Sequence, residues 1–462
     1  MTLPLRVSHA AIVDDDEGFF QRLRETEYSR LDAQDQAYLD FTGSALYAER
    51  QITANCERMR RSVFGNPHSE NGPSRMSTRL IERAKSKLLA FLDASPDEYV
   101  VCFTANTSAA IKLVAEGFQF GERAPLVMSA DNHNSVNGIR EYARLRHARV
   151  HYLPLDDKLR LRTAHQMLWQ LASRQGGLFA YPAQSNFSGV KHSLELISAA
   201  QRLGFTVLLD AAAFLPTNML SLRRYPADFV ALSAYKIAGY PTGVGALVAR
   251  RDALAHLQRP WFAGGTVDYA SVQQGTHLLS SGAEGFEDGT PAFLSIAALA
   301  DGLDFMNEIG IDRINRHVSQ MTGHLIDGLR SLRRRDGSPL VTVYGPGNEN
   351  DRGATVAFNI RGRDRAVVPF AAVVDRAREC GVSLRGGCFC NPGASEAAFE
   401  FPALSTGECL RSAAEQGFSI EKFAECMGPH IPVGAVRASL GVATNKRDVQ
   451  RAVSVVSSFT NL

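Results

Sequence analysis

Two cysteines stand one residue apart in "RGGCFCNPGA", a glycine-rich stretch that contains Cys388 and Cys390. A cysteine thiolate is a strong nucleophile when it is ionised and can reach its target, so we expect a mobile loop here. A zinc site needs four ligands, and the other cysteines offer no second close pair, so the sequence predicts no metal. A disulfide between such close neighbours would be strained. Two inert buried thiols remain the alternative, since free cysteine is often buried.

A lysine occupies a chemically suggestive position in "ALSAYKIAGYPTGVGALVAR". Lys236 follows an apolar run and precedes a turn rich in glycine and proline. A close-packed turn removes water from the amine, which lowers its pKa and suits Schiff-base chemistry. The alternative is a surface lysine whose stem lies along the protein. The apolar, glycine-rich surroundings argue against that alternative.

Polar residues also follow an expected strand in "FTANTSAAIKLV", where Asn106, Thr107 and Ser108 precede a helical pattern. Free backbone N–H groups and the helix dipole make such a position a natural phosphate cradle. The alternative is a simple N-cap, which these residue types also favour.

Two further residues lie where strands are expected to end. Asp210 closes the apolar run "FTVLLD", and a buried carboxylate there needs a cationic partner, for which a protonated pyridine nitrogen would serve. A structural or capping aspartate is the alternative. His133 stands among turn-forming residues, where its flat ring could stack on a flat cofactor or have a purely structural role.

The elements that must position these residues alternate between strand-like and helical patterns. We expect strands at 98–105, 124–130, 176–184, 205–213, 227–235 and 243–250, and helices at 108–118 and 194–204. This alternation predicts an α/β fold with a parallel or mixed sheet covered by helices on both faces. From about residue 295 the pattern changes to two helices at 295–332, a strand at 354–360 and a helix at 370–380.

The chain therefore divides into three predicted parts. Residues 1–35 have no clear core pattern and would pack on the domains, 36–295 form a large domain, and 296–462 form a smaller α+β domain with the cysteine loop. At 462 residues the chain is long enough for two domains.

Composition excludes several classes of partner. A net charge of +2 provides no field for nucleic acid or for an anionic membrane, and no apolar stretch is long enough to span a bilayer. The first twenty residues lack the apolar core of a signal peptide. Seven scattered cysteines indicate free thiols in a reducing cytoplasm and no disulfide framework.

The order of these sites, phosphate turn, histidine, aspartate and lysine, resembles that of fold-type I pyridoxal phosphate enzymes. The sequence is similar to the class V aminotransferase and cysteine desulfurase superfamily, and in particular to the aminotransferase-like domain of molybdenum cofactor sulfurases. The resemblance covers residues 38 to 450 and rests on "YLDFTGSALYA", "GNPHSENGPSRMSTRLIERAK", "FTANTSAAIKLVAE", "DNHNSVNGIREYA", "QSNFSGVKHSL", "LLDAAAFLPTN", "FEDGTPAF", "LRGGCFCNPGA" and "VRASLGVATN". It implies pyridoxal 5'-phosphate as cofactor and a large domain built on a seven-stranded, mainly parallel sheet.

The resemblance also implies a role for each candidate residue around the cofactor. Lys236 bonds to the cofactor and moves the substrate's α-proton, Asp210 pairs with the pyridine nitrogen, and His133 stacks on the ring. Asn186 hydrogen-bonds near the ring hydroxyl. The remaining implied cofactor contacts are Asn106, Thr107, Ser108, Ser233 and Tyr235. Thr290 would reach the phosphate of a neighbouring subunit, which implies a homodimer.

The implied substrate contacts lie in the second part of the chain. Arg437 would clamp the substrate carboxylate, a task for which a guanidinium fork is suited, although a surface ion pair is the alternative. Arg385 would assist at the same place and lower the pKa of the nearby thiol. The nucleophile itself would be Cys390, while the role of Cys388 stays open.

The sequence departs from the family at three positions. Tyr235 stands where many desulfurases have histidine, Ala213 where many have glutamine, and Ser395 where the sulfurase loop has another cysteine. The chain also ends near the end of the pyridoxal phosphate domain, without the further C-terminal domain of eukaryotic sulfurases. Transfer of sulfur to the molybdenum cofactor is therefore not implied.

These features predict a cysteine desulfurase or sulfurtransferase that converts L-cysteine to L-alanine and leaves a persulfide on Cys390. Its partners would be a small amino acid and a sulfur-accepting protein or small molecule. One alternative is another class V enzyme, such as an aminotransferase, a C–S lyase or a biosynthetic enzyme, that uses no persulfide. The other is a non-enzymatic binding protein on the same scaffold.

Overall fold

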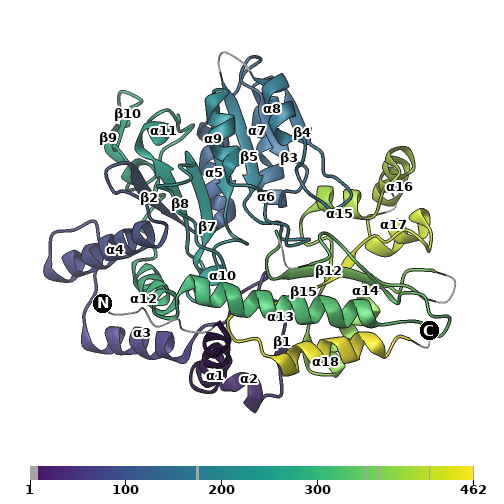
Figure 1. Ribbon diagram of the computed structural model, residues 1–462. Coiled ribbons are helices and arrows are strands. Elements are labelled where there is room, and N and C mark those ends of the chain that lie inside the picture. The colour runs from purple at the N-terminus through teal and green to yellow at the C-terminus, as the bar shows by residue number, and fades with distance from the viewer. Residues whose placement is uncertain (1–8, 173–175, 349–350, 363–364, 416, 461–462) are drawn as a thin grey trace, which may run out of the picture.

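The computed structural model describes residues 9–172, 176–348, 351–362, 365–415 and 417–460. In Figure 1 a large sheet with helices on both faces occupies the upper left, and a smaller sheet above the long helix α13 occupies the lower right. The helix α12 (Phe293–Ile309) leads from the first part into α13 (Ile311–Ser331). The limits of the two predicted domains remain a prediction, because one apolar core runs through α12 into both sheets.

The large sheet has seven strands in the order β2-β8-β7-β6-β5-β3-β4. Their bounds are Tyr99–Thr104 for β2, Leu126–Ser129 for β3, Val150–Leu153 for β4, Gly177–Pro182 for β5, Phe205–Asp210 for β6, Phe229–Ser233 for β7 and Gly245–Arg250 for β8. All pairs are parallel except those of β8, which is antiparallel to both β2 and β7. The predicted α/β fold with a mainly parallel sheet is confirmed.

Side chains of each central strand alternate between the two faces of this sheet, as strand geometry requires. In β2, Val100 and Cys102 join the core under α5 (Thr107–Gly117) and α7 (Ile139–Leu145). Val101 and Phe103 join the core on the opposite face. There they pack with α4 (Gly72–Phe91), α9 (Glu195–Arg202) and α12. Burial on both faces explains why these strands read as continuous apolar runs.

The smaller sheet is antiparallel, in the order β11-β12-β15-β14. Its strands are Val341–Val343 (β11), Thr355–Ile360 (β12), Arg385–Gly387 (β14) and Ala435–Ser439 (β15). The helices α13, α14 (Phe370–Glu379) and α18 (Lys446–Ser457) pack around it. Close beside this sheet, β1 (Ala37–Tyr38) pairs in parallel with β13 (Val382–Ser383). Residues from the start of the chain are thus joined to its last third.

The other elements are short or lie at the periphery. They are α2 (Arg30–Ala33), α3 (Glu49–Arg61), α6 (Asn134–Asn137), α8 (Ala164–Leu171), α10 (Ala234–Ala238), α11 (Arg251–Ala255), β9 (Val267–Ser271), β10 (Thr276–Leu279), α15 (Pro392–Ala398), α16 (Ala403–Glu415) and α17 (Ile420–Met427).

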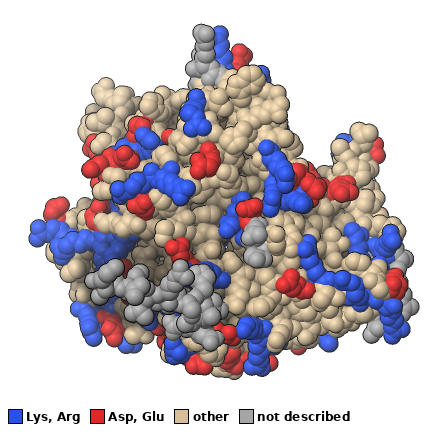
Figure 2. All heavy atoms as spheres, in the orientation of Figure 1, with Lys and Arg blue, Asp and Glu red and all other residues tan. Residues whose placement is uncertain are grey.

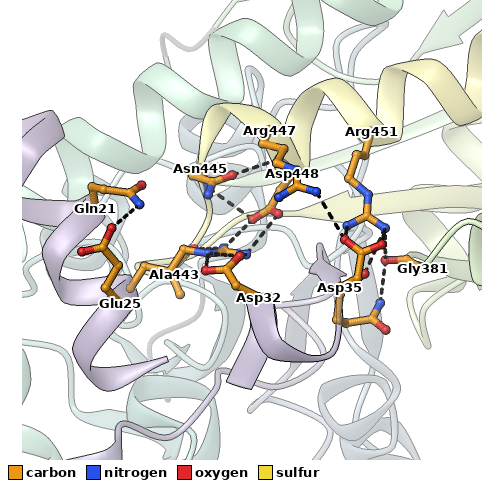
Figure 3. Close-up of polar contacts among 12 residues, drawn as sticks. Gln21, Glu25, Asp32, Asp35, Gly381, Ala443, Asn445, Arg447, Asp448 and Arg451 are labelled. Carbon is orange, nitrogen blue, oxygen red and sulfur yellow. Dashed lines mark hydrogen bonds and ion pairs between the residues drawn. The ribbon is translucent and has the colours of Figure 1, made fainter. Parts of the chain in front are cut away.

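The N-terminal segment forms a helix, α1 (His9–Glu27), which packs on α13 and α3. Phe20 and Leu23 are buried in the main core, and Arg24 donates to the Asp448 carboxylate at 2.7 Å and to the carboxylate of Asp32 at 2.9 Å. Figure 3 shows the surrounding contacts, with Asp32 of α2 and Asp448 of α18 near each other, and Arg24 hydrogen-bonds to both carboxylates. The segment is held by a buried ion pair more than by an apolar stripe, which explains its weak sequence pattern.

The expectation that the cysteines are free is wrong for one pair, because Cys409 and Cys426 form a disulfide. It joins α16 to α17, which project from the small sheet at the right of Figure 1. Their local core holds few buried apolar residues besides Cys409, namely Ala413, Phe423 and Met427, so a covalent link replaces missing packing. Cys388 and Cys390 are both free.

The visible face of the protein carries charges of both signs. Figure 2 shows acidic and basic side chains interspersed over the visible face, with no broad area of one sign. None of the helices in the described part of the chain is long and apolar enough to cross a bilayer. The cytoplasmic location stays a prediction.

The Arg24–Asp448 pair gives a test of the N-terminal packing. Both side chains are only 3% exposed, so Arg24→Ala leaves a buried carboxylate without its countercharge. We expect the free energy of unfolding in urea to fall by about 3 to 5 kcal/mol. Arg447→Ala is the matched control, because Arg447 and its partner Asp35 are both exposed, and it should cost less than about 1 kcal/mol. Equal effects of the two variants would contradict this account.

Candidate active site

A cavity of about 350 Å³ lies at the carboxyl ends of β5, β6 and β7. This is the edge of a parallel sheet at which α/β proteins bind ligands. Most of the predicted cofactor residues line it, namely Asn106, Thr107, Ser108, His133, Asn186, Asp210, Ser233, Tyr235 and Lys236. The structure therefore brings together side chains that are up to 130 positions apart in sequence. Its size suits a small-molecule ligand.

Lys236 reaches the cavity from α10, a short helix directly after β7. The helix ends at Gly239, whose φ of +75° favours glycine, and a Cβ there would collide with the backbone of Leu46. Burial lowers the pKa of Lys236, and the charges of Arg437 and Arg385 lower it further, while Asp210 and Cys390 oppose this shift. Burial is the largest of these effects. A lowered pKa favours the neutral, nucleophilic form of the amine.

Asp210 is the last residue of β6 and is buried. Its Oδ1 accepts a hydrogen bond from the backbone N–H of Ala212 at 3.0 Å. Within the described part of the chain, no side chain donates to Oδ2 and no cation lies within ion-pair distance. A buried carboxylate that faces a cavity in this way needs a cation from outside the chain. The nitrogen of a protonated pyridine ring fits this need.

Hydroxyl groups and a helix N-terminus form the opposite end of the cavity. Thr107 begins α5, its hydroxyl lies 2.5 Å from that of Ser233, and its backbone N–H donates to the same oxygen. The hydroxyls of Ser108 and Ser135 are 2.6 Å apart. Asn106 is the N-cap, since its side chain accepts from the backbone N–H of Ala109. Capping by Asn106 is therefore compatible with phosphate binding at the start of α5, because the cap uses only the N–H of Ala109.

His133 precedes α6 and accepts a hydrogen bond at Nδ1 from the backbone N–H of Ser135. Burial lowers the pKa of His133, and the charges of Lys236 and Arg437 act in the same direction against that of Asp210. The ring is thereby kept neutral and fixed, as a stacking surface requires.

The cysteine loop follows β14 of the small sheet and contacts the cavity wall at Asn186, although Cys390 is not itself among the lining residues. Cys390 is exposed, whereas Cys388 is half-buried and its thiol donates to the carbonyl of Val433 at 3.2 Å. Burial raises the pKa of Cys388, which keeps it in the less reactive thiol form. Asn186, a lining residue, donates to the carbonyl of Phe389 at 2.7 Å. The two cysteines thus differ in environment, and Cys390 has the accessible thiol.

The two arginines lie opposite each other on β14 and β15. Both bind Asp40: Arg437 Nη2 donates to Oδ1 at 2.9 Å and Arg385 Nη2 to Oδ2 at 2.6 Å. Arg437 also donates through Nη1 to the carbonyl of Asn186 at 2.9 Å, while its buried Nε has no partner among the described residues. One donor of the guanidinium is therefore unpaired within the described residues, and Arg437 is not among the residues that line the cavity.

Thr290 is the predicted cofactor residue that lies outside this cavity. It accepts a hydrogen bond from Asn66 and lines an adjoining cavity of about 360 Å³, with which the first shares Ala105 and Gly243. It is therefore not among the residues that line the cofactor cavity of its own chain. A contact to a second subunit remains a prediction.

Several residues of the site were not singled out from the sequence. Asp40 belongs to the quoted stretch "YLDFTGSALYA", and its carboxylate after an apolar run was the available signal. Gln184, Ser135 and Thr242 also line the cavity. No local pattern distinguishes these three from ordinary loop residues.

A buried lysine and aspartate at the carboxyl edge of a mainly parallel sheet, with a hydroxyl-lined helix N-terminus, define a fold-type I pyridoxal phosphate enzyme. The family model described as "Aminotransferase class-V" matches residues 37–452. The chain belongs to the class V aminotransferase family and is a pyridoxal phosphate-dependent enzyme. The carboxylate of Asp210, the lowered pKa of Lys236 and the hydroxyl cradle are chemically suited to that cofactor.

Among curated proteins, molybdenum cofactor sulfurase of Solanum lycopersicum is 34% identical over 94% of this chain. Molybdenum cofactor sulfurase 2 of Culex quinquefasciatus is 36% identical over 93%. The chain spans 56% and 57% of the length of these two relatives.

Among solved structures, a cysteine desulfurase from Thermococcus onnurineus NA1 superimposes with a TM-score of 0.77 at 24% identity, covering 96% of this chain and 98% of that one. The cysteine desulfurase CsdA from Escherichia coli gives a TM-score of 0.75 at 21% identity, covering 95% and 98%. These likenesses confirm the fold.

The lowered pKa of Lys236 predicts how the cofactor-free protein takes up pyridoxal phosphate. The reacting species is the neutral amine, so we expect the rate of the absorbance change to rise with pH with a midpoint below the ordinary lysine value of 10.5. Asp210 favours the charged amine, so Asp210→Asn should move the midpoint to still lower pH. Rapid mixing between pH 6 and 11 measures both midpoints, and an upward shift in the variant would refute the assignment.

Proposed function

We propose that this enzyme is a cysteine desulfurase or sulfurtransferase that converts L-cysteine to L-alanine and transfers sulfur to Cys390. The observation that carries the proposal is the exposed thiol of Cys390 on a loop that is hydrogen-bonded directly to a cavity residue, Asn186. An aminotransferase or a lyase without a persulfide needs no such thiol. Cys388, with its raised pKa and hydrogen bond to Val433, is the poorer candidate.

When bound, pyridoxal phosphate supplies an electron sink for negative charge at the α-carbon of an amino acid. In the proposed roles, Asp210 pairs with its ring nitrogen, His133 covers its ring, and the hydroxyls of Thr107, Ser108 and Ser233 with the start of α5 hold its phosphate. Lys236 is the base that removes the α-proton and later returns a proton to the product. Its neutral amine, the consequence of burial, is the form that can accept this proton.

Arg437 is proposed to bind the substrate carboxylate. Its buried, unpaired Nε–H offers a donor, and its other nitrogens are fixed by Asp40 and the carbonyl of Asn186. Arg385, which is half exposed and also bound to Asp40, adds positive charge at the entrance. The amino acid would then be oriented by a guanidinium that is already in place.

The thiolate of Cys390 attacks the sulfur of the substrate, and the carbon–sulfur bond breaks. The overall reaction balances as L-cysteine plus Cys390 thiol giving L-alanine plus Cys390 persulfide. The persulfide then passes its outer sulfur to an acceptor protein or small molecule, or releases sulfide when a thiol reductant is present.

Product analysis tests this proposal. Purified protein with pyridoxal phosphate, L-cysteine and dithiothreitol should form alanine and sulfide in equal amounts. Cys390→Ser should lower the rate of alanine formation by at least about 100-fold, because serine cannot accept the sulfur. Cys388→Ser is the matched control and should stay within about threefold of wild type, since its hydroxyl can keep the bond to Val433.

Two other outcomes would redirect the assignment. Absence of alanine in the wild-type reaction would refute desulfuration. Full activity of Cys390→Ser on some amino acid, combined with loss of activity in Lys236→Ala, would favour another class V reaction without a persulfide.

We also propose that the enzyme is a homodimer. The hairpin of β9 and β10, at the upper left of Figure 1, exposes apolar residues, including Tyr269 and Leu278, which are paired across the two strands. Trp261, which lines the cavity around Thr290, is half exposed as well. Exposed apolar side chains gathered in this way are typical of an interface. Covering them with a second chain would bring foreign residues to the region of Thr290.

Sedimentation velocity tests the dimer. The wild-type protein should sediment as a species of about twice the chain mass of 50.3 kDa. Leu278→Glu should yield monomer, because it places a charge in the proposed contact. The control is Leu145→Glu on α7, where the replaced side chain is also exposed, at 77% against 60% for Leu278. A monomeric wild type, or equal behaviour of both variants, would contradict the proposal.

A further inference from the structure

The backbone of the Cys390 loop has an unusual conformation. Phe389 and Cys390 both lie in the left-handed region, with φ of +56° and +55°. Residues with side chains adopt this conformation only where their surroundings enforce it. Both carbonyl groups are held: Asn186 Nδ2 donates to that of Phe389 at 2.7 Å, and the backbone N–H of Asn134 donates to that of Cys390 at 2.7 Å.

The residue after the thiol anchors this conformation. Asn391 is fully buried, and its Nδ2 donates to Asp131 Oδ1 at 2.6 Å and to Asn186 Oδ1 at 2.9 Å. Its own Oδ1 accepts from the backbone N–H of Ala394 at 3.2 Å and so caps α15. The Asn391 side chain therefore makes two separate kinds of contact: its amide donates to Asp131 and Asn186, and its oxygen accepts from the first turn of α15.

Asp131 fixes Asn391 from behind. It is fully buried, its Oδ1 also accepts from Ser185 Oγ at 2.8 Å, and its Oδ2 lies 2.8 Å from His192 Nε2. Asp131 and His192 are not among the residues that line the cofactor cavity. A buried carboxylate is costly unless it is paired and hydrogen-bonded, so this arrangement holds Asp131 in one orientation.

Close backbone packing fixes the loop at the same point. A Cβ at Gly393 would collide with the backbone oxygen of Ala130, the residue before Asp131. The start of α15 therefore lies directly on the loop that follows β3. Asn391 and Gly393 together join the thiol loop to the large sheet.

We propose that Asp131 and Asn391 are positioning residues for Cys390, which hold its loop in the left-handed conformation over the cofactor cavity. This inference deepens the proposed desulfurase function and rests on it for its kinetic consequence. Loss of the Asn391 amide would remove the donor that fixes Asn186, whose own amide holds the carbonyl of Phe389, and would separate the thiol loop from Asp131. The thiol would then be displaced. A displacement of the reacting atom by about 1 Å can slow a reaction by about 100-fold.

The decisive variant is Asn391→Ser, because serine retains an N-cap acceptor for α15 and removes the amide donor. We expect kcat for alanine formation to fall by about tenfold or more. KM for L-cysteine and the absorption maximum of the bound cofactor should change far less than kcat. The variant removes one bond to Asn186 Oδ1, while Arg437 keeps its bonds to Asp40 and to the carbonyl of Asn186. A general loss of stability would change all three together.

The matched control is Ser419→Ala. Ser419 caps α17 by accepting from the backbone N–H of Lys422, away from the thiol loop. This control should leave kcat within twofold of wild type. If Asn391→Ser does not fold, Asp131→Asn takes its place. This variant keeps the side-chain volume but leaves one acceptor oxygen for the three donors Ser185, His192 and Asn391. A kcat within twofold of wild type in the folded variant overturns the proposal.

Hydrogen exchange separates this inference from the proposed function. The backbone N–H of Asn134 donates to the carbonyl of Cys390, and that of Asn391 donates to the carbonyl of Cys388. Both amide hydrogens should exchange about tenfold faster in Asn391→Ser than in wild type. Their exchange rates should not change in Ser419→Ala. If the wild-type enzyme forms no alanine, the proposed desulfurase function is refuted. Hydrogen exchange alone then tests whether Asn391 anchors the loop. Unchanged exchange in Asn391→Ser overturns the anchoring whatever the reaction.

Discussion

One carboxylate, that of Asp40, holds together the two arginines proposed to bind the substrate. Arg385 and Arg437 are directly opposite each other on β14 and β15, a pairing that repels when nothing lies between the charges. The Asp40 carboxylate binds both guanidiniums. Arg437 is almost fully buried, and an unpaired buried guanidinium would cost several kcal/mol. Asp40 reaches this place because β1 runs parallel to β13 and residue 40 bridges to Ser439. The course of the chain near its start is therefore part of the site.

The cofactor side solves the opposite electrostatic problem. There the chain leaves charge uncompensated: Asp210 is buried with no cation of the described residues within ion-pair distance, and burial lowers the pKa of Lys236. An ion pair between them would satisfy the isolated protein and would hinder ligand binding. The two groups instead lie at different points of one cavity. They are suited to a ligand that carries a cation for Asp210 and an electrophile for Lys236. The site thus has two parts: the proposed substrate-binding arginines are already paired with Asp40, whereas Asp210 in the cofactor cavity has no cationic partner within ion-pair distance among the described residues.

Features with local sequence signals could be predicted. The central strands and α5 follow from apolar runs and helical periodicity, and the ends of parallel strands bring Asp210, Ser233 and Lys236 to one edge. The features that were missed depend on distant partners. Asp40 binds Arg437 across 397 positions, and Asp131 binds Asn391 across 260. The disulfide joins cysteines of two separate helices 17 positions apart, and α1 is held by one buried arginine. Such contacts arise from tertiary structure, which periodicity does not encode.

Tertiary contacts also explain why the two cysteines on either side of Phe389 differ in environment. The left-handed turn at Phe389 and Cys390 costs about 1 to 2 kcal/mol per residue, and hydrogen bonds worth about 1 kcal/mol each offset it. The turn leaves Cys388 bonded to Val433 and Cys390 exposed beside the cavity. Glycines before the thiols suggested a mobile loop, yet Gly386 and Gly387 are paired with β15 and the carbonyls after them are held. This geometry favours a model in which the thiol is fixed and the substrate is brought to it. It argues against a model in which a moving loop carries the thiol inward.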